Sequence, residues 1–154
     1  NVVPDAVLRT TLMTGFPGET EADFKHMVNF IKQVGFDHLG VFAYSDAEDL
    51  PAHRLDNPVE TAVAQERAET LMDIQQELSA HNLTRYLNSD MNVLIETGPD
   101  QGVWYGRTQF QAPEVDGQVI IRPMNSRIEL RTGSIVKARV VETMTYDLLV
   151  EVSD

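Results

Sequence analysis

The spacing of apolar residues changes along the chain and predicts two structural parts. Residues 7–14, VLRTTLMT, are apolar and β-branched enough for a strand that is buried on most sides. Apolar residues then recur at helical spacing from Phe24 to Val34, and Gly35 ends that run. A second apolar run covers residues 38–45. This order predicts a strand, helix and strand unit with parallel strands and a right-handed crossover.

The turn after the first strand has a distinctive composition. Residues 15–18 read Gly-Phe-Pro-Gly, and the glycines allow backbone conformations that are closed to other residues. Thr20 is a good N-cap for the following helix, with Asp23 as its capping-box partner. Functional residues in such units lie at the C-terminal ends of the strands, here residues 14–18 and 44–46.

A long second helix is predicted after an acidic loop at residues 46–57. Asn57 is expected to be its N-cap, with Pro58 in the first turn and Glu60 completing the cap. The helical pattern fades near residues 82–88.

From residue 91 onward the pattern alternates between apolar and polar positions. Five segments read as strands separated by turn residues: 91–97, 103–108, 117–123, 134–142 and 147–152. Such strands favour a small closed antiparallel barrel, because closure removes exposed strand edges. The predicted fold class is therefore α/β plus β, with domains at residues 1–84 and 85–154. A parallel barrel needs eight strand and helix units, so we expect neighbouring strands before Asn1.

Composition limits the possible partners. Twelve Lys and Arg against twenty-four Asp and Glu give a net charge of −12, which would repel a phosphate backbone. The charge fits either simple solubility or a basic macromolecular partner. Residues 122–139 are an exception, with five basic side chains and one acid, Glu129. This stretch could be an RNA-facing strip or the solvated face of a hairpin.

The residue inventory excludes several kinds of site. The chain has no cysteine, and its four histidines lack ligand-like spacing, so no metal ligand is expected. No stretch approaches the roughly 18 apolar residues of a membrane span, and no signal peptide is apparent. We therefore expect a cytoplasmic location and no membrane partner.

Four segments together resemble the C-terminal half of radical S-adenosylmethionine methylthiotransferases. They are RTTLMTGFPGETEADF, VFAYSDAEDLPAHRL, ERAETLMDIQQELSAHN and VLIETGPDQGVWYGRTQFQAPEVDGQV. The resemblance implies that residues 1–84 are the last βα units of a radical SAM (partial TIM-like) barrel with a long connecting helix. It implies that residues 85–154 are a TRAM domain, which is an OB-like barrel.

The family has two branches that differ in substrate. One modifies a tRNA base, and the RimO branch modifies an aspartate of the twelfth protein of the small ribosomal subunit. The segments QAPEVDGQV and YDLLVEV resemble the RimO branch, and the negative charge suits a basic ribosomal protein. A small-subunit ribosomal protein or the ribosome is thus the expected partner, with tRNA less favoured. A free-standing protein- or RNA-binding module is the remaining alternative.

The resemblance also implies cofactors. Members of the family hold a 4Fe-4S cluster on three cysteines, which cleaves S-adenosylmethionine to a 5′-deoxyadenosyl radical, and a second 4Fe-4S cluster that delivers sulfur. None of those cysteines is present, so we expect no catalytic residue in this chain and no activity from it alone.

Candidate binding residues follow from the resemblance and the strand ends. Thr14, Gly15 and Phe16, with Tyr44 and Ser45 from the next strand, are expected to form the wall of the S-adenosylmethionine site. Small glycines would let the backbone approach the ligand closely. The alternative is that the glycines serve only the turn and Phe16 only the core.

Two further groups of residues have candidate roles. Trp104, Tyr105 and Arg107 are candidates for substrate binding on the barrel, although strand alternation lets only one of the two aromatic residues face outward. Glu19 and Glu21 lie in the first helical turn, where the helix dipole favours carboxylates, so a structural role is expected for both.

Overall fold

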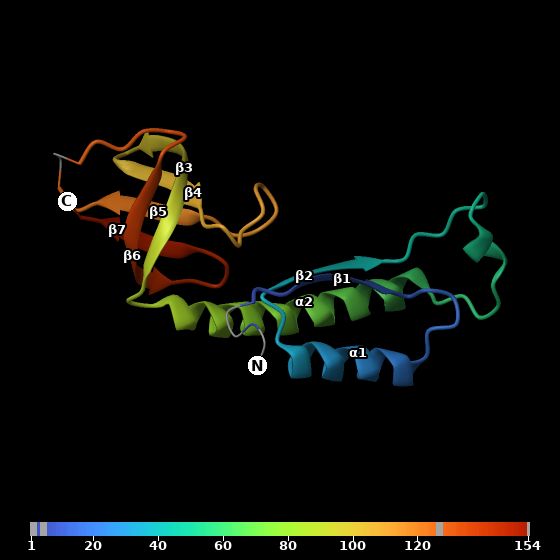
Figure 1. The fold of residues 1–154 in the computed structure, drawn as a ribbon. Helices are drawn as coiled ribbons and strands as arrows, with labels where there is room; N and C mark the ends of the chain where they lie inside the picture. Colours follow the sequence, from blue (N-terminus) through green and yellow to red (C-terminus); the bar gives the residue numbers. More distant parts are fainter. Residues whose placement is uncertain (1–2, 4–5, 126–127, 154) are drawn as a thin grey trace. The chain divides into compact units, whose positions relative to one another are not determined.

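The computed structural model describes residue 3 and residues 6–125 and 128–153 (Figure 1). The chain divides into two compact units, Asn1–Leu78 and Ser79–Asp154. Each unit has its own sheet and its own hydrophobic core. The predicted domain ranges, 1–84 and 85–154, remain predictions.

The first unit is built on the predicted strand, helix and strand unit. Its elements are β1 (Arg9–Thr14), α1 (Glu21–Val34), β2 (His38–Ala43), the 3-10 helix η1 (Pro51–Arg54) and α2 (Thr61–Leu83), whose last residues enter the second unit. β1 and β2 pair in parallel, from Arg9 opposite His38 to Thr14 opposite Ala43. The parallel pairing of the two predicted strands is confirmed.

Local sequence sets both ends of α1. The Oγ1 atom of Thr20 accepts a 3.2 Å hydrogen bond from the Asp23 amide, and the Asp23 carboxylate accepts from the Thr20 amide at 2.9 Å. At the other end Gly35 adopts a left-handed φ of 66°, and its amide donates to the Ile31 carbonyl at 2.9 Å. The predicted capping box and glycine stop are both confirmed.

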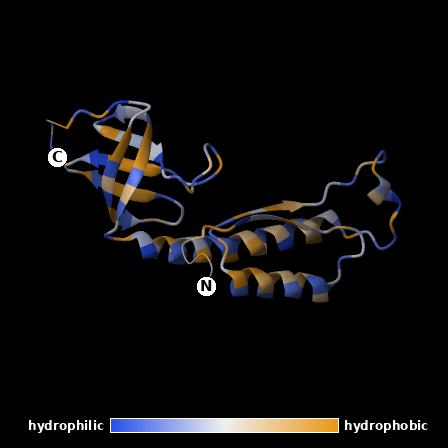
Figure 2. Cartoon of the chain, in the orientation of Figure 1, coloured by the Kyte–Doolittle hydropathy of each residue, from blue (hydrophilic) through white to orange (hydrophobic). Residues whose placement is uncertain are grey.

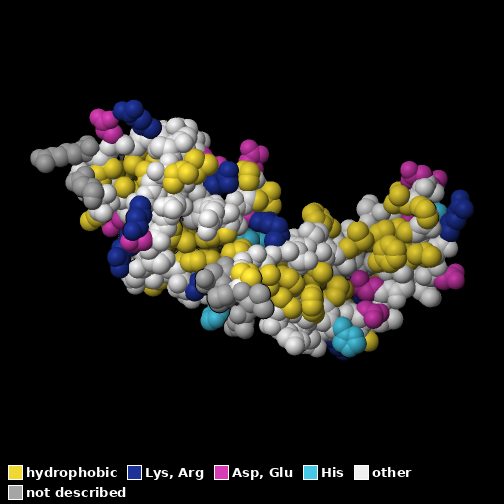
Figure 3. Space-filling model, viewed as in Figure 1, with side chains coloured by type: hydrophobic (Ala, Val, Ile, Leu, Met, Phe, Trp, Pro, Cys, Tyr) yellow, Lys and Arg dark blue, Asp and Glu magenta, His cyan; other side chains and the backbone are white. Residues whose placement is uncertain are grey.

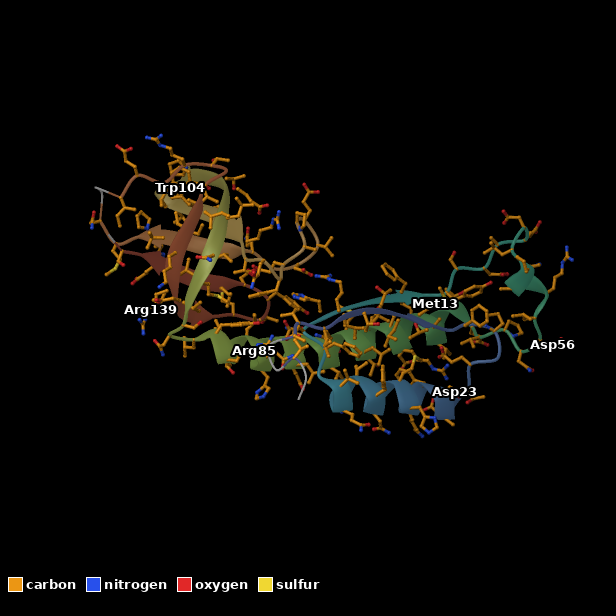
Figure 4. The ribbon with its side chains drawn as sticks, viewed as in Figure 1. Met13, Asp23, Asp56, Arg85, Trp104 and Arg139 are labelled. Carbon is orange, nitrogen blue, oxygen red and sulfur yellow. The ribbon has the colours of Figure 1, made fainter. Side chains whose placement is uncertain are left out.

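The two faces of the β1–β2 sheet differ. One face contributes to a core with α1 and α2, in which Ile31, Leu39 and Leu71 are buried. On the other face Met13 and Phe42 are opposite each other in the parallel register and are 51% and 63% exposed. Apolar side chains at the surface appear in Figure 3, and Met13 is labelled in Figure 4.

The start of α2 differs from the prediction. Asn57 was expected to be the N-cap, but the helix begins at Thr61 and Asn57 has a left-handed φ of 59°. An N-cap residue has extended backbone instead. The Asn57 carbonyl accepts a 2.8 Å hydrogen bond from the Gly18 amide, so this residue ties the loop to the turn after β1. This tertiary contact overrides the local capping preference.

The second unit is a closed five-stranded barrel in the order β3-β4-β5-β7-β6. It follows the 3-10 helix η2 (Thr84–Tyr86) and contains β3 (Asp90–Asp100), β4 (Val103–Arg107), β5 (Val119–Pro123), β6 (Ile135–Thr143) and β7 (Leu148–Val152). All five predicted strands and the closure are confirmed. The prediction of a wholly antiparallel barrel is wrong at one pair, because β5 and β7 run parallel. The β6–β7 hairpin brings β7 beside β5 in the same direction.

Alternating side chains fill the barrel, and Figure 2 shows hydrophobic and hydrophilic residues mixed along its strands. The fully buried residues of its core are Val93, Ile95, Val119, Ile121, Val140, Leu148 and Val150. On β6 Ala138 and Val140 are buried, whereas Lys137 and Arg139 between and before them are exposed. Within the described ranges, no helix is long and apolar enough to cross a membrane.

Candidate functional site

The turn after β1 lies tightly against α2. The Thr14 hydroxyl is buried and donates a 2.8 Å hydrogen bond to the Ala64 carbonyl. Gly15 has a φ of 76°, and a Cβ atom on it would lie 2.2 Å from the Ala64 Cβ. Glycine is therefore required here by the helix contact and by the left-handed backbone. The clearance that the sequence suggested for a ligand is occupied by Ala64.

A buried ion pair fastens the same turn. One oxygen of Glu19 accepts a 2.8 Å hydrogen bond from the Gly15 amide, and its other oxygen lies 2.5 Å from Arg67 Nη1. The side chains of Arg67 and Glu19 are only 11% and 8% exposed. Arg67 also lies 3.4 Å from a Glu21 oxygen and stacks over the Phe24 ring at 5.3 Å.

Sequence reasoning gave Glu19 only a helix-dipole role and missed Arg67. The sequence did contain a signal for Arg67. Counting from the buried residue Ala64, Arg67 is at i+3 and the buried residue Leu71 is at i+7, so all three lie on one face of the helix. A cation on an apolar stripe requires a buried partner. Glu19, the acidic residue in the turn after β1, was the candidate partner for Arg67.

The C-terminal ends of β1 and β2 carry an aromatic pair, in which Phe16 is exposed and Tyr44 is half-buried. The rings of Phe16 and Tyr44 meet edge to face, with centroids 5.3 Å apart and planes at 74°. Phe16 is 43% exposed, so it is not the core residue that the alternative reading proposed. Ser45 follows Tyr44 and is exposed. The structure thus brings the predicted residues of the two strand ends together at one edge.

A polar chain continues from this pair into the loop after β2. The Tyr44 hydroxyl donates to Asp46 Oδ1 at 3.3 Å, and His53 Nδ1 lies 2.8 Å from Asp46 Oδ2. The hydrogen bond with His53 is the main cause that lowers the pKa of Asp46. Desolvation, and then the nearby Asp46 charge, raises the pKa of Tyr44. Tyr44 therefore stays protonated and can donate at neutral pH.

The predicted cofactor wall fits an adenosine-like ligand only in part. Phe16, Tyr44 and Ser45 offer accessible aromatic and hydroxyl groups, which suit a flat heterocycle and its sugar. The Thr14 hydroxyl and the Gly15 amide are buried and already bonded within the protein. Their contribution to a ligand would be indirect, through the shape of the turn. A binding role for all five residues remains a prediction.

The residues present do not fit an iron-sulfur cluster. The chain has no cysteine to supply thiolate ligands. Among the described residues, no group of three or more His, Asp or Glu side chains is placed to hold a metal ion.

The barrel candidates separate as strand alternation requires. Trp104 packs against the barrel core and is labelled in Figure 4, and a Cβ atom on Gly98 would lie 2.9 Å from its ring. Tyr105 and Arg107 therefore occupy the other face of β4. Arg107 Nε lies 2.8 Å from Glu96 Oε1, so its charge is already partnered. A substrate role for these three residues remains a prediction.

An open groove of about 330 Å³ lies beside Arg107 on the barrel. It is lined by Glu96, Gly106, Arg107, Ala112, Pro113, Glu114, Asp116, Gly117, Gln118 and Asp147. Four acids thus surround one arginine that is already paired. Sequence analysis missed this groove because its lining comes from four separated segments.

The basic stretch at residues 122–139 is partly neutralised. Asp90 lies 3.2 Å from Lys137 Nζ and 3.8 Å from Arg139 Nη1. Glu129 lies 3.1 Å from Arg131. Arg127 lies outside the described residues. These acids weaken the case for an RNA-facing strip.

A strand, helix and strand unit followed by a closed mixed barrel defines a two-part protein with an OB-like second module. Residues 89–152 match the TRAM domain family, so the second unit contains a TRAM domain. The chain is 43% identical over 150 residues to the ribosomal protein uS12 methylthiotransferase RimO of Clostridioides difficile, covering 97% of this chain and 33% of the relative.

Two further RimO proteins give similar matches. Identity is 38% over 152 residues with that of Francisella philomiragia, covering 98% of this chain and 34% of the relative. It is 43% over 145 residues with that of Desulfosudis oleivorans, covering 94% and 32%. The chain thus spans about a third of the length of these relatives. The resemblance to the RimO branch of the methylthiotransferases is confirmed, and the match fits the C-terminal part of such a protein.

A likeness to a solved structure is weak. A multidomain protein with nucleic acid binding domains from Streptococcus pneumoniae aligns with 45% of this chain and 23% of its own. Sequence identity is 17% and the TM-score is 0.35, and this likeness carries no inference.

Proposed function

We propose that this chain is part of a radical S-adenosylmethionine methylthiotransferase that modifies an aspartate of a small-subunit ribosomal protein. The observation that carries the proposal is the 43% identity, over 97% of the chain, to a protein named as a uS12 methylthiotransferase. The iron-sulfur clusters of the reaction would be held by parts of the longer protein that this proposal requires. This chain would contribute a binding edge and a docking domain.

The first unit supports the proposal through its open sheet face. Parallel strands are normally covered on both faces, yet Met13 and Phe42 are half exposed or more. In a larger barrel this face would line the interior, with further strands beside β1 and β2. The edge formed by Phe16 and Tyr44 would then border the reaction chamber.

At that edge the roles of the side chains follow from their chemistry. S-adenosylmethionine, when bound, supplies the methyl group and the radical chemistry. The exposed ring of Phe16 and the half-buried ring of Tyr44 would shield the adenine from water and fix its plane. The Tyr44 hydroxyl stays protonated, and Asp46 orients it. None of these residues is proposed to transfer a proton.

The second unit is proposed to dock the substrate protein. Ribosomal proteins are basic, and the second unit is acidic, with ten Asp and Glu against seven Lys and Arg in residues 79–154. The barrel groove offers a place where basic side chains could bind, because Glu114, Asp116 and Asp147 line it in addition to Glu96, which pairs with Arg107. Electrostatic attraction of this kind would mainly accelerate association and would weaken with salt.

One observation favours a second candidate, the modification of tRNA. Tyr105 and Arg107 share a face of β4, and an aromatic ring near a guanidinium is suited to bases and phosphates. Arg107 is, however, paired with Glu96, and the exposed Lys137 and Arg139 are both close to Asp90. These pairings favour the ribosomal protein over tRNA.

A binding experiment separates the two substrates. The purified chain would be titrated with small-subunit protein uS12 and with tRNA at several salt concentrations. We expect binding of uS12 that weakens as salt rises, and little binding of tRNA. Tight tRNA binding with a steep dependence on log salt, and no binding of uS12, would contradict the proposal.

A further inference from the structure

We propose that Arg67 on α2 is a positioning residue for the edge of the first unit that Phe16 and Tyr44 form. Acting through Glu19, it holds the turn after β1 in the conformation that presents Phe16 to an adenosine-containing ligand. The inference rests on the proposed function, since it requires that the edge binds such a ligand. It assigns a role to a residue that lies on a different element from the predicted site.

Glu19 clamps the turn from both sides. Its backbone amide donates a 2.9 Å hydrogen bond to the Phe16 carbonyl, which closes the turn. Its carboxylate accepts a 2.8 Å hydrogen bond from the buried Gly15 amide. The peptide planes before and after the Gly15–Phe16 pair are thus fixed by one residue. Rotation of the Glu19 side chain would release the Gly15 amide and loosen the peptide plane before Gly15, which helps to set the orientation of Phe16.

Arg67 determines where the Glu19 carboxylate lies. The guanidinium is 2.5 Å from the Glu19 oxygen that does not bind Gly15, so each oxygen has its own partner. A carboxylate that is 8% exposed needs such a partner, because burial of an unpaired charge is strongly unfavourable. Without the cation, Glu19 would turn toward water and lose the Gly15 amide.

The position of Arg67 itself is set by α1 and by its own helix. The guanidinium stacks over Phe24 at 5.3 Å and reaches Glu21 at 3.4 Å. One helical turn before it, Ala64 contacts Gly15 and accepts the Thr14 hydroxyl. Ala64 and Arg67, one helical turn apart on the same face of α2, therefore both hold the turn. Ala64 acts through packing and its carbonyl, whereas Arg67 acts through its charge.

The geometry separates two functions of Glu19, which allows a sharp test. Pairing with Arg67 needs a negative charge, whereas holding Gly15 needs an acceptor oxygen. R67K keeps the cation, R67M removes it, and the charge swap E19R/R67E keeps an ion pair but removes the acceptor for Gly15. K25M is the matched control, because it removes an exposed lysine that pairs with Glu21 on α1 at 3.6 Å.

S-adenosylmethionine affinity would be measured by calorimetry on the full-length, cluster-reconstituted protein, well below its melting temperature. Protection of the Gly15 amide would be followed by hydrogen exchange in the same variants. We expect K25M and R67K to bind within about threefold of wild type, and R67M to bind roughly tenfold more weakly, with Gly15 protection reduced in parallel. The charge swap should not restore affinity.

The outcomes are distinguishable. No ligand binding by the wild-type protein would refute the proposed function, and with it the inference. Wild-type binding with unchanged affinity in folded R67M would overturn the inference alone. Equal losses in R67K and R67M would also overturn it, because they would point to packing of the guanidinium rather than to its charge. If E19R/R67E does not fold, the comparison of S-adenosylmethionine affinity between R67K and R67M still tests the role of the Arg67 charge.

Discussion

Met13 on β1 and Phe42 on β2 are opposite each other in the parallel register, and both expose more than half of their surface. Parallel sheets rarely leave such a face uncovered, because their strands are apolar on both sides. We propose that this surface is covered by other parts of the longer protein to which the proposed function assigns the chain. This relationship links the fold of the chain to its proposed place in a barrel.

The exposed pair predicts self-association of the chain alone. We expect the wild-type chain to associate at high concentration and M13S/F42S to associate at least about tenfold more weakly, because apolar area buried between chains is lost. Sedimentation velocity over a concentration series measures the effect. L50S is the control, since Leu50 is 42% exposed in the loop after β2. Equal association of M13S/F42S and wild type would contradict the prediction.

Gly15 is predicted to tolerate no side chain. G15A should lower the free energy of unfolding by about 2 to 4 kcal/mol, because the new methyl group meets Ala64 and the backbone is left-handed. G18A isolates the backbone part, since Gly18 has a φ of 91° with nothing within 4 Å of a Cβ atom, and it should cost about 1 to 2 kcal/mol. Urea denaturation compares the two. A cost for G15A no greater than that for G18A would refute the packing explanation.

The contact between His53 and Asp46 predicts a site-specific titration. The hydrogen bond with His53 lowers the pKa of Asp46 from 3.8, so H53A should raise that pKa toward 3.8. Because the folded-state pKa is below the unfolded value, the stabilising contribution is present above pH 3.8 and is lost as pH falls through the folded pKa. Carbon NMR of the carboxyl group follows the change.

A second carboxylate supplies the control for that titration. Hydrogen bonds from Thr20 lower the pKa of Asp23, so T20A should raise the pKa of Asp23 and leave Asp46 unchanged. H53A should raise the pKa of Asp46 and leave the pKa of Asp23 unchanged. Equal movement of both carboxylates in either variant would show a global effect instead of the two local contacts.

The barrel groove predicts a charge-dependent docking site. E114K should weaken the binding of uS12 about threefold or more at low salt, with most of the change in the association rate, because Glu114 lines the groove and is exposed. E77K makes the same change of net charge at an exposed position of α2 and is the control. Surface plasmon resonance gives both rates. The same loss in the two variants would refute a local role for the groove.

Features that depend on local sequence were predictable. Both ends of α1 depend on a few adjacent residues. The capping box of Thr20 and Asp23 and the helix end at Gly35 are both present. The five barrel strands followed from alternation and turn residues. Asn57 failed as an N-cap because its carbonyl binds the Gly18 amide, a partner that is distant in sequence.

Features that depend on tertiary contacts were not predictable in the same way. The sequence marks Gly15 as a position that needs glycine, but the structural reason is its close approach to Ala64, which lies some fifty residues later in the chain. The pair of Glu19 and Arg67 joins a turn to a helix, and the barrel groove collects side chains from four segments. The parallel pairing of β5 with β7 depends on how the chain returns after β5, which strand patterns do not specify.

The proposed function assigns this chain to an enzyme that methylthiolates a ribosomal protein. The most direct measurement is mass spectrometry of uS12 and tRNA after incubation with the full-length, cluster-reconstituted protein, S-adenosylmethionine, a sulfur source and a reductant. We expect one added methylthio group on an aspartate of uS12 and unmodified tRNA. A methylthio group on a tRNA base, with uS12 unchanged, would contradict it.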